Sequence, residues 1–99
     1  MHFIKNEELE NYNHIIDFFI HGSEREKKDE IPNYYYWSNL MFAVQKLSNL
    51  YNFVLETLRN GIFSASFLTK DYEILGSSKS KNMKYATYIA LLHLIDSQI

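Results

Sequence analysis

Apolar positions near the start of the chain recur with the period of an α-helix. Spacings of three and four residues place one set of large side chains on a single helix face, and this pattern predicts a helix over 6–20. Asn6 is the expected N-cap, and Gly22 is expected to end the helix. The apolar face of this helix consists of Leu9, Tyr12, Ile16 and Phe19.

A second helical pattern follows Pro32 and the aromatic run 34–37. It predicts a helix over 39–50, with Ser38 as its N-cap. The mixed-charge run 23–30 between the two helices is interpreted as a solvent-exposed loop. The apolar face of the second helix consists of Leu40, Ala43, Val44, Leu47 and Leu50.

The middle of the chain changes to alternating apolar and polar positions, which is the period of a β-strand. Two such runs, 53–58 and 63–68, predict two strands. Between them stands Asn60-Gly61, which favours a type I′ turn because both central residues of that turn need positive φ. We therefore expect these two strands to form an antiparallel hairpin.

A further turn leads into a short third strand over 72–75, which Gly76 is expected to end. The final helix is expected to begin at Ser77 or Ser78 and to end near Asp96. Small Ala side chains on its apolar stripe would let this helix pack closely on the sheet. The stripe consists of Met83, Ala86, Ala90 and Leu94, and it is widened by Thr87 and Leu91.

In chain order, the expected elements are a helix, a second helix, three strands and a last helix. This order predicts an α+β fold in which a three-stranded antiparallel sheet is flanked by helices. No repeat or linker is visible. We therefore expect one domain over 38–99, preceded by an N-terminal helical extension over 1–37.

Composition excludes several classes of protein. The 99 residues can bury one modest core, and a hydrophobic content of 46% is typical of a globular chain. The chain has no Cys, which excludes disulfides and thiolate metal sites and fits an intracellular protein, cytoplasmic or nuclear. No apolar run approaches the ~18 residues of a membrane span, so we expect no membrane partner.

Charge is distributed unevenly along the chain. Residues 1–37 carry four Lys or Arg and eight Asp or Glu, a net charge of −4. Residues 38–99 carry six Lys or Arg and four Asp or Glu, a net charge of +2. The difference in sign indicates a basic face on the second part of the chain.

Gly76 is followed by a stretch rich in Ser and Lys, 77–81, and then by a helix with several Ala, while the strand 63–67 begins with Phe and alternates. With these features, 38–99 resembles the double-stranded RNA-binding domain, whose elements follow the order α-β-β-β-α. The resemblance implies a small protein that binds duplex RNA without a cofactor and without sequence specificity. Such recognition depends on shape, 2′-hydroxyls and phosphates, because the major groove of A-form RNA is too deep and narrow to read.

The resemblance also implies which residues contact the RNA. Lysines at the start of the final helix would contact phosphates, because the helix dipole and free N–H groups attract anions there. The first hairpin and the preceding helix would contact minor-groove edges, although this hairpin is shorter than in family members that bind RNA well and lacks their His. The implied phosphate contacts are Lys79, Lys81 and Lys84, and the implied minor-groove contacts are Arg59, Asn60 and Gln45.

The final helix carries a second apolar stripe, which cannot face the sheet together with the first. This stripe could pack on the N-terminal helix, on a second copy of the chain or on another protein. A second hypothesis follows, namely a module of the same fold that mediates protein–protein interaction or dimerisation and has lost RNA binding. The second stripe consists of Tyr85, Tyr88, Leu92 and Ile95.

No pattern in the chain indicates catalysis or metal binding. The four His residues lack metal-ligand spacing, no nucleophile elbow surrounds a Ser, and no Gly-rich phosphate loop is present. We therefore expect a binding protein that is not an enzyme and that uses no cofactor or metal ion.

Overall fold

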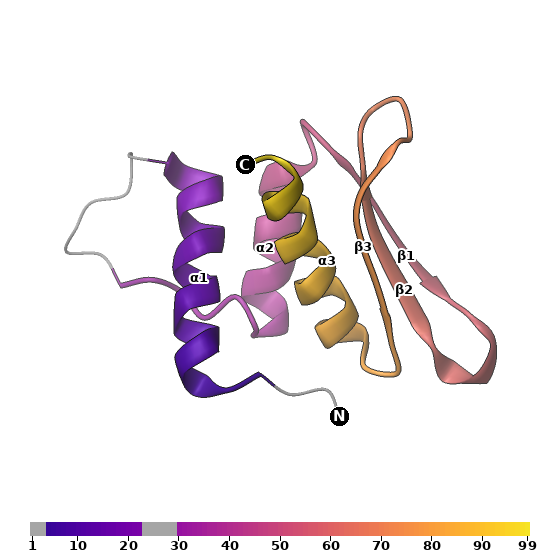
Figure 1. The fold of residues 1–99 in the computed structure, drawn as a ribbon, viewed down its shortest axis with the longest axis horizontal. Coiled ribbons are helices and arrows are strands. Elements are labelled where there is room, and N and C mark those ends of the chain that lie inside the picture. The colour runs from indigo at the N-terminus through magenta and orange to yellow at the C-terminus, as the bar shows by residue number, and fades with distance from the viewer. Residues whose placement is uncertain (1–3, 23–29) are drawn as a thin grey trace.

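The computed structural model describes residues 4–22 and 30–99. Within these residues, three α-helices and a three-stranded antiparallel sheet confirm the predicted α+β class (Figure 1). Except for Glu30, the loop predicted over 23–30 lies outside the described residues. The elements are α1 (Asn6–His21), α2 (Trp37–Leu47), β1 (Asn52–Thr57), the 3₁₀ turn η2 (Arg59–Gly61), β2 (Phe63–Leu68), β3 (Ile74–Ser80) and α3 (Met83–Ser97).

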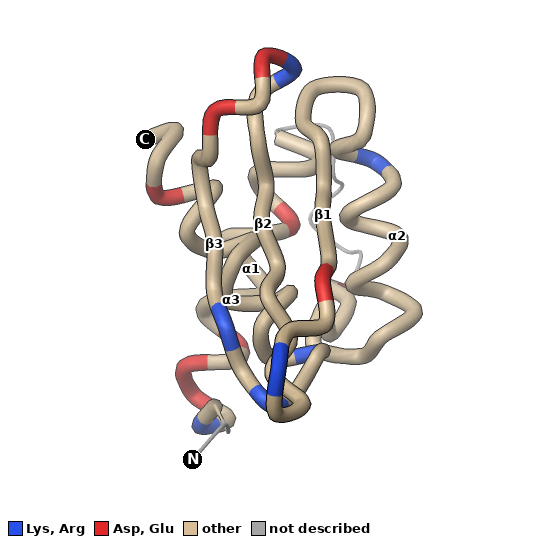
Figure 2. The backbone as a smooth tube through the Cα atoms, turned by 90° about the vertical axis from the view of Figure 1, so that its right-hand side faces the viewer, with Lys and Arg blue, Asp and Glu red and all other residues tan. Residues whose placement is uncertain are grey.

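The helices stack on one face of the sheet. The strand order is β1-β2-β3, with antiparallel neighbours, and α3 lies against β2 and β3. Helix α1 lies farthest from the sheet and contacts α2 and α3 (Figure 1). The opposite face of the sheet, which Figure 2 shows from the front, is covered by no described element.

One core extends from the sheet to α1. Phe67 in β2, Leu94 in α3 and Ile16 in α1 belong to the same buried cluster, as does Tyr34 between α1 and α2. The described residues of 1–37 therefore share one core with 38–99. Helix α3 is buried on nearly all sides because it lies between the sheet and α1. Among the described residues, no helix is long and apolar enough to cross a membrane.

The predicted end of the third strand at Gly76 is wrong. Gly76 lies inside β3, which continues to Ser80. A Cβ on Gly76 would overlap the backbone N of Leu94 and would lie 2.5 Å from the backbone O of Ala90. Because Gly76 has no side chain, the backbone of α3 can lie directly on β3. Gly76 therefore allows close packing inside the strand and does not end the strand.

The predicted start of the final helix at Ser77 or Ser78 is also wrong. These residues pair with β2, and α3 begins at Met83. Asn82 is its N-cap, because the side-chain oxygen of Asn82 accepts a hydrogen bond from the N–H of Tyr85 at 3.1 Å.

Other local predictions have mixed outcomes. The turn residues Asn60 and Gly61 both have positive φ, 64° and 73°, as predicted, and Gly22 ends α1 with φ 59°. The predicted N-caps are wrong, because Asn6 and Ser38 lie within the helices. The actual N-caps are Lys5 and Tyr36, which make no side-chain capping bond, and α2 ends at Leu47 instead of Leu50.

A buried polar network attaches α1 to the rest of the fold. The side-chain oxygen of Asn13 accepts hydrogen bonds from the Tyr88 hydroxyl at 2.7 Å and from the Tyr34 N–H at 3.1 Å. The amide nitrogen of Asn13 donates to the side-chain oxygen of Asn33 at 3.1 Å, and the Tyr34 hydroxyl donates to Asp17 at 2.6 Å. These bonds satisfy polar groups that would otherwise be costly to bury.

Candidate nucleic-acid interface

Two chain connections meet at one end of the sheet. Because the strands are antiparallel, the β1–β2 turn and the β3–α3 connection lie at the same end, where Phe63 pairs with Thr57 on one side and with Ser80 on the other. Figure 2 shows basic residues gathered at this end. We call this cluster the basic end, and it consists of Arg59, Lys79, Lys81 and Lys84.

The charges of the basic end are available to a ligand. Arg59, Lys79 and Lys81 are exposed, and Lys84 is partly exposed. Among the described residues, none of the four forms an ion pair with a carboxylate. Glu56 is the one acidic residue on the hairpin strands β1 and β2, and Ser64 separates it from Lys79 across the sheet. The end therefore presents uncompensated positive charge.

The lysines are not arranged as the sequence predicted. Lys79 lies in β3 and Lys81 precedes α3, so only Lys84 lies in the first turn of the helix. The prediction placed all three in the helix because it began the helix too early. They still lie at the same end of the molecule, since β3 leads directly into α3.

An aromatic segment borders the basic end. The Nζ of Lys84 lies 4.1 Å from the centroid of the Tyr35 ring, a cation–π contact, and the Tyr35 and Tyr88 rings form a T-shaped pair with centroids 5.0 Å apart. Burial raises the pKa of Tyr35, and the neighbouring Tyr85 raises it further. The start of α2, at Trp37, is thereby placed beside the basic end.

Gln45 is not brought to the basic end. It lies exposed in the last turn of α2, next to the connection that leads into β1, whereas Arg59 follows the end of β1. The six residues of β1, a strand roughly 20 Å long, lie between the two in the chain. Gln45 lines a separate hollow of about 310 Å³ together with Phe42, Lys46 and Asn49.

The second stripe of α3 faces the chain's own α1. Tyr88 and Ile95 are buried, with 0% and 3% of their surface exposed, whereas Tyr85 and Leu92 are partly exposed. Burial raises the pKa of Tyr88, with smaller contributions from Tyr12 and Tyr35. Of the three alternatives for this stripe, packing on the chain's own N-terminal helix accounts for Tyr88 and Ile95, which are therefore buried within the chain and do not form an interface with a partner.

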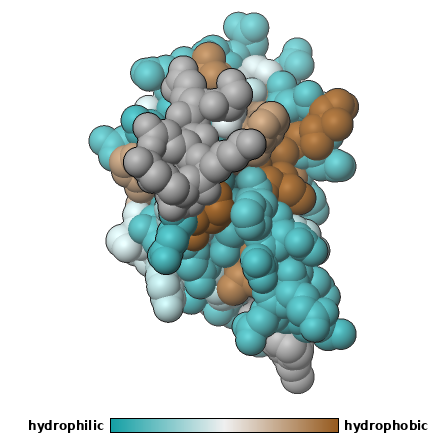
Figure 3. Space-filling model, turned by 90° about the vertical axis from the view of Figure 1, so that its left-hand side faces the viewer, coloured by the Kyte–Doolittle hydropathy of each residue, from teal (hydrophilic) through white to brown (hydrophobic). Residues whose placement is uncertain are grey.

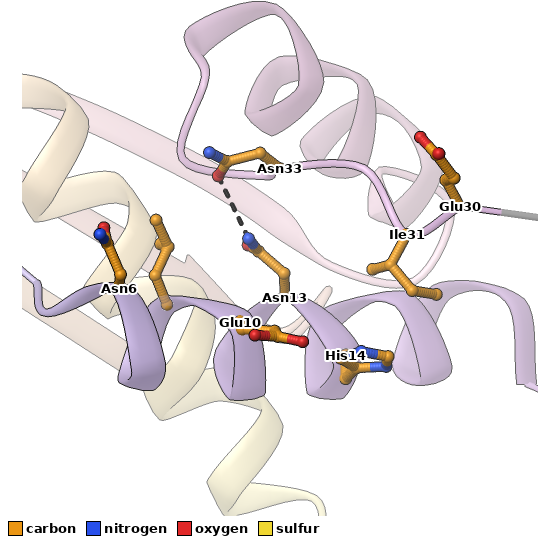
Figure 4. Close-up of a pocket in the computed structure, with 8 residues that line it drawn as sticks. Asn6, Glu10, Asn13, His14, Glu30, Ile31 and Asn33 are labelled. Atoms are coloured by element: carbon orange, nitrogen blue, oxygen red, sulfur yellow. Dashed lines mark hydrogen bonds between the residues drawn. The ribbon is translucent and has the colours of Figure 1, made fainter.

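A hollow of about 500 Å³ lies between α1 and the segment that precedes α2 (Figure 4). Figure 4 shows the hydrogen bond from Asn13 to Asn33 in its wall, with His14, Glu10 and Glu30 also lining it. Among the described residues, no group of three or more His, Asp or Glu side chains is placed to hold a metal ion.

Sequence reasoning missed two features of this region. The network around Asn13 was missed because a polar residue within a helix carries no local signal of its partners. The aromatic segment was visible as the run 34–37, but its position beside Lys84 depends on the tertiary fold. No protein-family model, curated protein or solved structure matches the chain significantly.

Proposed function

We propose that this protein binds double-stranded RNA through the basic end, recognising duplex shape and phosphates without sequence specificity. The observation that carries the proposal is the gathering of four cations, none ion-paired among the described residues, at the end of the sheet where β3 leads into α3. The order of α2, the three strands and α3 is that of the double-stranded RNA-binding domain, which the sequence resembles.

The starts of two helices add to this positive potential. Helix α3 begins beside Lys81, and the Tyr35–Lys84 contact places the start of α2 nearby. The first N–H groups of a helix have no intrahelical partner, and the helix dipole favours negative charge there. The N-cap Tyr36 makes no side-chain capping bond at the start of α2. Phosphate oxygens would satisfy such groups.

The test compares two double variants with the same loss of charge. Lys79→Ala/Lys81→Ala removes two cations from the basic end, and the control Lys46→Ala/Lys70→Ala removes two exposed cations at the opposite end of the sheet, in the last turn of α2 and on the β2–β3 turn. Fluorescence anisotropy with a ~20-base-pair RNA duplex, longer than the ~16 base pairs such domains span, measures binding at several salt concentrations.

We expect the basic-end variant to bind more weakly and to lower the slope of log affinity against log salt by about two, because each phosphate contact releases counterions. The control should retain most of its affinity and slope. If the two variants lost affinity and salt slope to the same extent, the assignment of the RNA-binding site to the basic end would be wrong. Binding to a DNA duplex of the same sequence, measured in the same way, tests whether the protein distinguishes RNA from DNA by the shape of the duplex.

A second candidate function is self-association through the outer surface of α1. Phe18 is 69% exposed and Ile15 is 44% exposed, and both line a hollow of about 520 Å³ with Ile99. Figure 3 shows hydrophobic residues at the surface on this face of the molecule. If this surface joins two copies, Phe18→Ser should dissociate them in sedimentation, whereas the control Phe42→Ser should not. A wild-type chain that remains monomeric at high concentration would exclude this candidate.

A further inference from the structure

Two large aromatic side chains lie at the surface beside the basic end. Tyr36 is 64% exposed and Trp37 is 37% exposed. They directly follow Tyr35, whose ring contacts the ammonium group of Lys84 at 4.1 Å. Single exposed aromatics are common on proteins, but here two consecutive ones accompany four cations. Phosphate binding does not use them, so their position calls for a separate role.

The segment that carries these rings is held in place by hydrogen bonds. The backbone oxygen of Asn33 accepts bonds from the Tyr36 N–H at 3.1 Å and from the Asn39 side chain at 3.0 Å. The side-chain oxygen of Asn33 accepts a bond from the Tyr35 N–H at 2.9 Å and another from Asn13. Because the backbone of the turn is fixed before binding, this segment would lose less conformational entropy when its aromatic side chains contact a ligand.

Aromatic side chains beside a phosphate-binding surface select for an exposed base. Within a continuous duplex, each base is stacked between its neighbours and offers no free face. An unpaired base next to a duplex does offer one, and stacking such a base on an aromatic ring adds affinity in single-strand-binding proteins. Arrangements of aromatic residues and cations are typical of proteins that bind unpaired nucleotides.

We propose that the basic end and the pair Tyr36–Trp37 together bind the junction between double-stranded and single-stranded RNA. This inference rests on the proposed function: the cations bind duplex phosphates, and the aromatic pair stacks on the first unpaired base. The ligand class is therefore a duplex with a single-stranded extension, and a continuous duplex is the weaker ligand.

The test uses two RNAs with the same ~20-base-pair duplex, one blunt and one with a short single-stranded extension. We expect wild-type protein to bind the extended RNA about tenfold more tightly, which corresponds to ~1.4 kcal/mol from one stacked base. Tyr36→Ala/Trp37→Ala should remove this preference and leave affinity for the blunt duplex within about twofold. Tyr72→Ala, which alters a 74% exposed Tyr on the β2–β3 turn, is the matched control and should keep the preference.

Trp37 also provides a direct readout, because it is the only Trp in the chain. Its fluorescence should be quenched by the extended RNA and much less by the blunt duplex. Equal affinity for the two RNAs, or unchanged Trp37 fluorescence on binding, would overturn the junction inference while leaving duplex binding intact. Failure of the wild-type protein to bind either RNA at low salt would overturn both proposals. Circular dichroism confirms that each variant is folded.

Discussion

The side-chain oxygen of Asn13 in α1 accepts a hydrogen bond of 2.7 Å from the hydroxyl of Tyr88 in α3, 75 residues further along the chain. The same oxygen accepts the backbone N–H of Tyr34. One amide group therefore joins three segments at a buried point, and α1 is positioned by this polar contact as well as by its apolar face.

Asn13→Ala should destabilise the protein by about 3 kcal/mol, because it leaves two buried donors, the Tyr88 hydroxyl and the Tyr34 N–H, without an acceptor. Urea unfolding followed by circular dichroism measures the free energy of unfolding. Asn11→Ala, at an exposed position of the same helix, is the control and should change little. If both variants lose the same stability, the network does not hold α1 in place.

Gly76→Ala should destabilise the protein by about 3 kcal/mol, because the new methyl group would overlap the backbone of α3 at Leu94 and Ala90. The neighbouring exposed residue of β3 gives the control Ser77→Ala. Thermal unfolding of both variants checks the expectation. A Gly76→Ala protein as stable as the control would mean that α3 does not lie directly on β3.

Asn82→Ala should cost about 1 kcal/mol, because Asn82 caps α3 through the N–H of Tyr85. Asn6→Ala and Ser38→Ala should leave the free energy of unfolding nearly unchanged, since neither residue is an N-cap in the fold. Urea unfolding of the three variants shows which of the three side chains stabilises the start of a helix. If Ser38→Ala lowered the free energy of unfolding as much as Asn82→Ala, Ser38 would be the N-cap of α2, as expected from the sequence.

Stability should fall as the pH rises above about 10. Burial raises the pKa of Tyr88 and of Tyr35 above the ordinary Tyr value of 10. Above that pH the unfolded chain loses these protons before the folded chain does, so the unfolded state is favoured. Below about pH 10 both tyrosines are protonated in the folded and the unfolded state, so their contribution to stability is fully present.

Urea unfolding between pH 8 and pH 11, roughly one to two units on either side of an ordinary Tyr pKa, measures this decline. Tyr88→Phe should be less stable at neutral pH, because the bond to Asn13 is lost, but should decline less steeply at alkaline pH. A wild-type free energy of unfolding that is constant over this range would contradict the expectation.

Some features of this protein follow from neighbouring residues alone. The apolar period of α1 and its end at Gly22 were predicted, as was the turn at Asn60-Gly61. These signals are local, because helix periodicity and the preference for positive φ belong to the residues themselves. The α+β class followed from the order of such signals.

The boundary between β3 and α3 required the tertiary structure. Gly76 and the serines after it resemble a strand end and a helix start when only local preferences are considered. Pairing of 77–80 with β2, and the close approach of α3 to Gly76, override those preferences. The helix therefore begins at Met83, and Lys79 becomes a strand residue.

The sequence by itself determined the cations, the aromatic run 34–37 and the amphipathic elements that carry them. Only the tertiary structure decided which of these residues meet. The antiparallel register brings Arg59 to the same end as Lys79, and helix packing places Tyr35 under Lys84. Such contacts between distant segments depend on strand pairing and core packing over the whole chain, and no local pattern encodes them.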